Sequence, residues 1–212
     1  MCTGLYYKSF YKDINTEEEP LNKFVVALLA DELAEVQIKW LDENLDSSPI
    51  IIAGKCDETS TYRFSCTTQK ITVKHVFKGT NIKIGDKIEI ARHGSGIFLD
   101  EENYINEKPC INMGFVNEMV VANTYLIFLE KELETYDENT IYIQSEEYII
   151  APIFSYEEVE NIAYNSIDDY GDFIEYKDIK QNEFFLMSEN EINNMNKLKA
   201  KLLGKYSLPC HN

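Results

Sequence analysis

Short apolar runs rich in β-branched and aromatic residues constrain the fold of this chain most strongly. Two of them occupy residues 49–56 and 123–130. Runs of this length and composition are typical of buried strands, because β-branched and aromatic side chains pack well on a pleated surface. Further strands are expected at residues 87–91, 140–143 and 147–154. The middle of the chain is therefore predicted to be mainly β.

The segment 61–77 alternates in two phases. Its apolar residues fall on even positions up to Cys66 and on odd positions from Ile71 onward. This change of phase predicts one long strand with a bulge near residues 67–70, because a bulge inserts one unpaired residue. Bends of this kind occur where a sheet curls into a barrel. We therefore expect a curled sheet.

Helices are predicted at both ends of this β region. Residues 17–44 begin with a capping-box pair, Thr16 and Glu19, and carry an apolar stripe at helical spacing. The last helix is expected to begin after Ser188, which has the N-cap spacing to a glutamate, and to stop at Gly204. The stripe of the first helix consists of Leu21, Val25, Leu28, Leu29, Leu33, Val36 and Trp40.

The chain is predicted to form one domain with additions at both ends. Residues 1–16 are interpreted as a tether, and residues 17–154 as the long helix plus the β region. Residues 155–212 are interpreted as an acidic helical extension packed on the β region, with a short helix at residues 155–163. No Pro- or Gly-rich linker separates these parts of the sequence.

The net charge excludes several classes of partner. The chain has 20 basic and 37 acidic residues, so its formal charge is −17 with histidine neutral. Nucleic-acid binding needs clustered lysine and arginine, yet Arg63 and Arg92 are the only arginines in the sequence. An anionic membrane surface would also repel such a chain. No run approaches the roughly 18 apolar residues of a membrane span, so no transmembrane segment is predicted.

Four short motifs occur in a fixed order within residues 48–130. They are Ala53-Gly54-Lys55, Val76-Phe77-Lys78-Gly79, Gly85-Asp86-Lys87 and Tyr125-Leu126-Ile127-Phe128. This order resembles the netrin-like group, which includes the N-terminal domain of tissue inhibitors of metalloproteinases. The resemblance implies an OB-type five-stranded β-barrel. It also implies an exported module that binds a partner. Together with the predicted helices, the expected fold class is mainly β (α+β).

The N-terminus departs from that group. The inhibitors open with Cys-x-Cys and chelate a protease zinc through the first cysteine, whereas Cys2 is followed by Thr3 and Gly4. Cys2-Thr3-Gly4 resembles the start of a mature bacterial lipoprotein, which implies a lipid anchor on Cys2. The opening also resembles choloylglycine hydrolases, which implies Cys2 as an N-terminal nucleophile, although their Arg-Asn-x-Asp continuation is missing. An inert cysteine is the remaining interpretation.

The other cysteines are Cys56, Cys66, Cys110 and Cys210. Cys110 and Cys210 each follow a proline and are candidates for a disulfide that ties the tail to the β region. Closing a loop of about 100 residues is worth roughly 4–5 kcal/mol in the chain-entropy model. Cys56 and Cys66 flank the first predicted hairpin and are candidates for a second disulfide. The alternative is that they are small buried apolar residues.

No metal or cofactor site is predicted. His75 is interpreted as a packed strand residue, and the Gly-Ser-Gly loop after His93 lacks the strand–loop–helix context of a nucleotide site. The acidic stretch 168–178 does not have EF-hand spacing and is interpreted as a solvated surface. No nucleophile, base and orienting group stand together, so no catalytic residue is assigned.

These observations lead to one functional hypothesis with two alternatives. The leading hypothesis is a non-enzymatic binding module exported to a bacterial cell surface, with a protein partner, no cofactor and a lipid on Cys2. The first alternative is an N-terminal-nucleophile amidohydrolase that uses Cys2. The second is an intracellular structural protein, which is expected to be cytoplasmic if Met1 is the native start.

Overall fold

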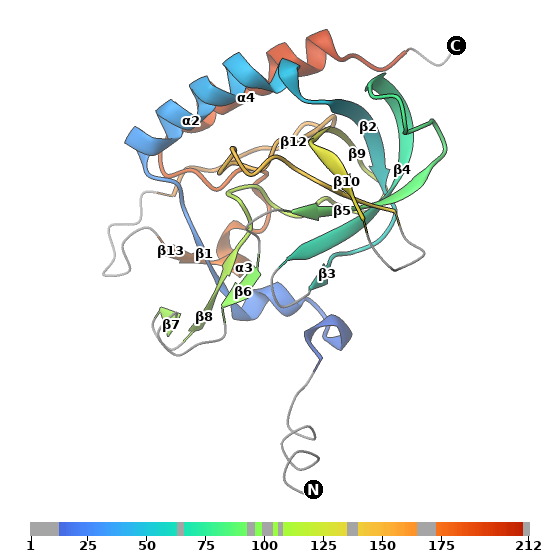
Figure 1. Cartoon of the computed structure of the whole chain (residues 1–212). Coiled ribbons are helices and arrows are strands. Elements are labelled where there is room, and N and C mark those ends of the chain that lie inside the picture. Colours follow the sequence, from blue (N-terminus) through green and yellow to red (C-terminus); the bar gives the residue numbers. More distant parts are fainter. Residues whose placement is uncertain are drawn as a thin grey trace, which may run out of the picture.

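The computed structural model describes residues 13–62, 66–92, 108–134, 140–164 and 173–209, and the backbone alone at 96–98 and 104–105. Within these ranges the chain forms two β-sheets with a few helices, so the mainly β (α+β) prediction is confirmed (Figure 1). Helices α2 (Asp31–Asn44) and α4 (Glu189–Lys205) lie side by side and cover one face of the larger sheet (Figure 1).

The larger sheet is an open sheet rather than the five-stranded barrel that was predicted. Among the described residues its strands follow the order β10-β11-β5-β4-β2-β9-β12, with β3 added to β4. Neighbouring strands are antiparallel except β11, which runs parallel to β5. The strands are β2 (Ile50–Cys56), β3 (Thr61–Tyr62), β4 (Thr67–Lys78), β5 (Lys87–Arg92), β9 (Thr124–Leu129), β10 (Lys131–Leu133), β11 (Ile141–Ile143) and β12 (Ile153–Ser155).

The two-phase segment 61–77 is a hairpin, which corrects the prediction of one bulged strand. Strand β3 pairs antiparallel with the start of β4, with Tyr62 opposite Thr67. The two phases therefore belong to two antiparallel strands rather than to one, which accounts for the change of phase. Irregular register occurs instead between β2 and β4, on either side of Ile52 and Ala53.

The predicted helix over residues 17–44 is wrong in its first half. The chain forms two 3-10 turns, η1 (Ile14–Thr16) and η2 (Pro20–Lys23), and then strand β1 (Val25–Ala27). Proline is excluded from a helix interior, and β-branched residues suit a strand that pairs on both edges. Strand β1 lies between β8 (Lys108–Asn112) and β13 (Phe173–Glu175) in the smaller sheet, which β6 (Gly96–Phe98) and β7 (Tyr104–Ile105) complete.

Helix α2 buries a different face from the predicted stripe. Leu33, Val36 and Trp40 are exposed, at 45%, 60% and 42%, whereas Ala34 and Leu41 are fully buried. The apolar residues before the helix are buried as part of strand β1 and its flanking residues. The buried face of the helix is therefore set only by the positions from Asp31 onward. Its buried face packs against α4 and the larger sheet.

The C-terminal part contains one confirmed and one incorrect prediction. Helix α4 is preceded by Ser188, whose hydroxyl accepts a hydrogen bond from the Glu191 N–H at 3.3 Å. Residues 155–163 are not helical; after Ser155 the segment runs without a helix, and the Ile162 N–H donates to Asn182 Oδ1 at 3.1 Å. External partners thus replace intrahelical hydrogen bonds. A single helical turn, α3 (Tyr176–Ile179), follows β13.

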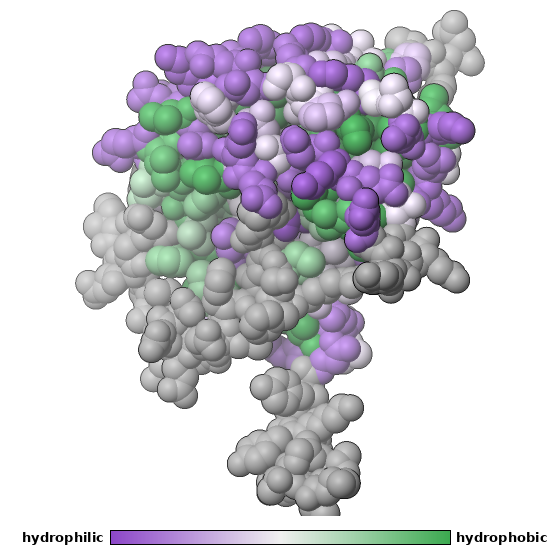
Figure 2. Space-filling view, in the orientation of Figure 1, coloured by the Kyte–Doolittle hydropathy of each residue, from purple (hydrophilic) through white to green (hydrophobic). Residues whose placement is uncertain are grey.

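The core has three apolar clusters. One lies between the larger sheet and helices α2 and α4, the second on the other face of that sheet, and the third beneath the smaller sheet. The surface over α2 and α4 is mostly hydrophilic in the view of Figure 2. Within the described ranges, no helix has the length and apolar character needed to span a membrane.

Candidate functional site

A pocket of about 290 Å³ lies where the N-terminal turns, the β2–β3 connection, the segment 116–120 and α3 meet. Three carboxylates line it, from Glu17, Glu19 and Glu118, and among the described residues the one basic group that lines it belongs to Lys180. The lining also includes Asn22, Ser60, Tyr62 and Tyr176. The pocket is therefore small, acidic and partly aromatic.

The N-terminal turns hold their carboxylates with local ion pairs. Glu17 pairs with Lys23, and Glu19 accepts from Lys180 Nζ at 3.2 Å and from the Asn22 amide at 2.5 Å. The hydrogen bond from Lys180 is the largest cause of the lowered pKa of Glu19. Glu19 has φ 47°, in the left-handed region that non-glycine residues rarely adopt. Backbone strain of this kind is frequent at functional sites.

Glu118 lies deeper and has a phenol as its partner. Tyr62 Oη donates to Glu118 Oε1 at 2.5 Å. Burial raises the pKa of Tyr62, and the neighbouring Glu118 charge raises it further. Among the described residues no lysine or arginine forms an ion pair with Glu118. The pocket therefore contains a half-buried carboxylate that forms no ion pair within the described part of the chain.

Two polar atoms at the pocket have no hydrogen-bond partner. Ser60 is only 8% exposed, and its Oγ has no partner; the same holds for Asn22 Oδ1. Buried polar groups are nearly always hydrogen-bonded, because leaving one unpaired costs about 1–3 kcal/mol. These atoms thus supply hydrogen-bonding capacity that a bound group can use.

Buried side chains from the larger sheet hold the segment 116–120 in place. Arg92, on β5, donates to the carbonyls of Val116 and Asn117, both at 2.7 Å. Gln69, on β4, accepts from the Met119 N–H and donates to its carbonyl, both at 2.9 Å. Burial lowers the pKa of Arg92, and the Glu118 charge opposes that effect. Glu118 is therefore fixed by its backbone neighbours.

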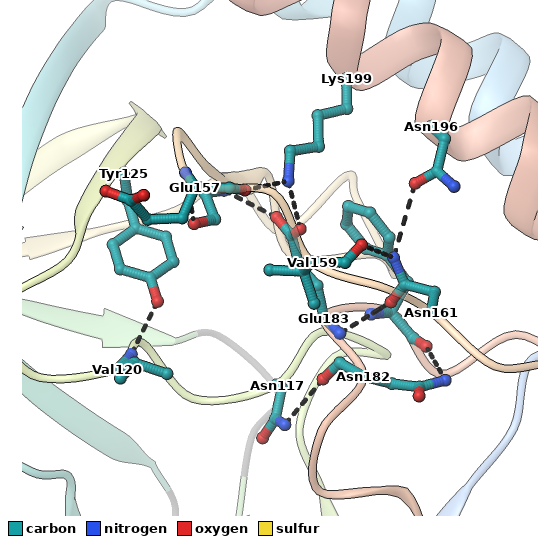
Figure 3. A network of polar contacts seen from close by, with 12 residues as sticks. Asn117, Val120, Tyr125, Glu157, Val159, Asn161, Asn182, Glu183, Asn196 and Lys199 are labelled. Carbon is teal, nitrogen blue, oxygen red and sulfur yellow. Dashed lines mark hydrogen bonds and ion pairs between the residues drawn. The ribbon is translucent and has the colours of Figure 1, made fainter.

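A second network extends this support toward α4 (Figure 3). The Asn117 amide donates to the Asn182 carbonyl at 2.8 Å. Next in sequence, Glu183 forms a buried ion pair with Lys199 at 2.5 Å and accepts from the Ser155 N–H at 2.7 Å. Burial is the largest cause of the raised pKa of Glu183, which Lys199 partly offsets. Because the charges are paired within the chain, we assign this network a structural role.

Most residues predicted as sites lie elsewhere. Cys2, Cys210, His93 and residues 168–172 fall outside the described residues, so the lipid anchor on Cys2 stays a prediction. Cys110, the predicted disulfide partner of Cys210, is a free cysteine in the structure. His75 packs on Phe77 with ring centroids 4.5 Å apart. In the described part of the chain, no group of three or more potential ligands could hold a metal ion.

The described cysteines are separate from the pocket. Cys56 is buried and its thiol donates to the Glu58 carbonyl at 3.2 Å; burial raises its pKa to about 11. No disulfide joins it to Cys66 within the described structure. Cys110 is a half-buried free thiol, and burial raises its pKa to about 11 as well. Thiols with raised pKa values are weak nucleophiles at neutral pH.

Sequence reasoning missed Ser60, Tyr62 and Glu118 as site residues. Tyr62 and Glu118 are 56 positions apart and no motif connects them. Only the tertiary structure brings them together.

Comparison with known proteins identifies no family for this chain. No model of a known protein family matches it, and no curated protein matches it.

Proposed function

We propose that this protein is a non-enzymatic binding module that captures a positively charged group of its partner in the Glu118 pocket. The observation that carries the proposal is the half-buried Glu118 carboxylate, which faces a pocket and lacks an ion-pair partner among the described residues. A charge pair 4 Å apart is worth about 4 kcal/mol at an effective dielectric constant near 20, before desolvation is subtracted. A cation is thus the ligand class that this pocket favours.

A binding role is better supported than catalysis. Thr59 and Ser60 supply the aliphatic hydroxyls of the described lining, and Ser60 Oγ, the buried one, has no hydrogen-bonded base. A serine nucleophile requires an adjacent base to be activated. The phenols of Tyr62 and Tyr176 have raised pKa values, chiefly through burial, so they stay protonated and act as donors.

The strand pairing supports a relationship to OB-type, netrin-like folds as part of this proposal. The segment 124–133 provides both β9, which pairs with β2, and β10, which pairs with β11, and only Glu130 separates them. Tyr142 of β11 and Ile52 of β2 also share one core cluster, although their strands are not neighbours. An OB-fold is a partly open five-stranded barrel, and a curled sheet with this strand order is compatible with such a barrel.

Binding of small monovalent cations tests the function. We expect n-butylammonium to shift the amide resonances of Ser60, Tyr62 and Glu118, and Glu118→Gln to weaken this binding about tenfold, which corresponds to 1.4 kcal/mol. The matched control is Glu32→Gln, which removes the same charge from the exposed face of α2 and should leave the affinity unchanged. Equal affinities in all three proteins would contradict a Glu118 site.

Export to the cell surface through a lipid on Cys2 is the second part of the proposal. Its support is the sequence Cys2-Thr3-Gly4. Intact-mass spectrometry of the protein from its native host should give a diacylglycerol adduct on Cys2. A mass with unmodified Cys2 would contradict the anchor, and a reactive Cys2 with amide hydrolysis would favour the amidohydrolase alternative.

A further inference from the structure

We infer that the cation taken by the Glu118 pocket is a primary alkylammonium, the group at the end of a lysine side chain, in preference to a quaternary ammonium or a guanidinium. This inference rests on the proposed function and specifies its ligand. Its basis is the match between the donors of each cation and the acceptors that the pocket leaves unused.

Residues with available acceptors line the same small pocket. Ser60 Oγ and Asn22 Oδ1 have no partner, and Glu118 supplies the negative charge. A primary ammonium has three N–H donors around one point charge, so it can pair with acceptors of this kind. A quaternary ammonium has no N–H donor and would leave Ser60 buried and unpaired.

A guanidinium matches the pocket less well. It binds carboxylates best through two parallel hydrogen bonds to both oxygens. In this pocket Glu118 Oε1 already accepts the Tyr62 hydroxyl at 2.5 Å. The two-oxygen arrangement therefore requires Tyr62 to give up its hydrogen bond.

The outer carboxylates already bind ammonium groups of this chain. Glu17 pairs with Lys23, and Glu19 pairs with Lys180. The volume of about 290 Å³ is at the lower end for ligand pockets, so it suits a group of side-chain size. Lys180 also lines the pocket, and its positive charge opposes a second cation there, so moderate rather than tight affinity is expected.

The test compares cations of equal charge on the intact protein. Binding of n-butylammonium, n-butylguanidinium and tetramethylammonium is measured by NMR titration at constant ionic strength. We expect n-butylammonium to bind at least about fivefold more tightly than either other cation. Ser60→Ala should remove most of this preference, because it should weaken the binding of n-butylammonium and leave the binding of the other two cations unchanged. Ser47→Ala, at an exposed serine in the turn that follows α2, is the matched control.

The outcomes separate the inference from the proposed function. If tetramethylammonium or n-butylguanidinium binds as tightly as n-butylammonium, and Glu118→Gln weakens them all, the ammonium inference is overturned and the cation site stands. If no cation binds, both fall. Should Ser60→Ala fail to fold, Asn22→Ala provides the same comparison from the other unpartnered acceptor. An acetylated Gly-Lys-Gly peptide that binds more tightly than n-butylammonium would assign a protein side chain as the source.

Discussion

Replacing Lys199 by methionine is expected to lower the free energy of unfolding by about 3–5 kcal/mol, the usual cost of removing one partner of a buried ion pair. Lys199 is 9% exposed and Glu183 is 6% exposed, so the variant leaves a carboxylate buried without its cation. Its aliphatic stem is retained by methionine, which keeps most of the packing. Urea unfolding followed by circular dichroism measures the change.

The pH dependence of this loss has a defined sign. Burial raises the pKa of Glu183 above its ordinary value, and Lys199 lowers it in part. Without Lys199 the pKa rises further, so the neutral acid is favoured in the folded state. The stability of the variant should therefore recover relative to the wild type as the pH falls through this raised pKa. This recovery of stability should disappear again as the pH rises.

The control for this prediction lies on the same helix. Lys201 pairs with Asp42 at 2.5 Å, but the two side chains are 63% and 42% exposed. Lys201→Met should change stability by about 0–1 kcal/mol, since exposed ion pairs contribute little. Adding Glu183→Gln to Lys199→Met should restore part of the loss. Similar losses for Lys199→Met and Lys201→Met would show that burial of the pair is not decisive.

Replacing Arg92 by methionine is expected to lower the free energy of unfolding by about 3–6 kcal/mol, because two buried or partly buried backbone carbonyls lose a charged donor and each loss is worth about 1.5–3 kcal/mol. Those carbonyls belong to Val116 and Asn117, next to Glu118. The segment that carries Glu118 should loosen, so amide hydrogen exchange at Met119 should accelerate more than exchange in α4. Cation binding should weaken with it.

A surface lysine provides the comparison for Arg92. Lys70, on β4, pairs with Glu58 at 3.1 Å, and both side chains are about half exposed. Lys70→Met removes the same charge. It should change the free energy of unfolding by no more than about 1 kcal/mol and should leave amide hydrogen exchange at Met119 unchanged. Unchanged exchange at Met119 in Arg92→Met would show that Gln69 alone holds the segment.

Elements whose signals are local in the sequence were predicted correctly, whereas elements that depend on distant segments were not. Strands β2, β5 and β9 and helix α4 were found because their signals are local: apolar runs in the strands, and a cap with an amphipathic pattern in the helix. Strand β1 was missed because its pairing partners, β8 and β13, lie far away in sequence. Its residues also fit the spacing of a helix, and only Pro20 argued against one.

The pocket was not predictable for a related reason. Glu118 is one of many acidic residues, and its burial depends on Arg92 and Gln69, which come from other strands. The absence of a partner for Ser60 is likewise a property of the folded chain. A single sequence shows which groups are present but not which of them remain unpaired.

The exposed position of Trp40 determines how unfolding of this protein can be observed. It is the only tryptophan in the chain, and it is 42% exposed on α2 in the native state. Its fluorescence therefore reports on a surface helix, and its emission has little room to shift when the sheets separate. Tyr125 and Tyr142 are buried in the second core cluster. Tyrosine signals in the near ultraviolet are thus the optical reporters of the larger sheet.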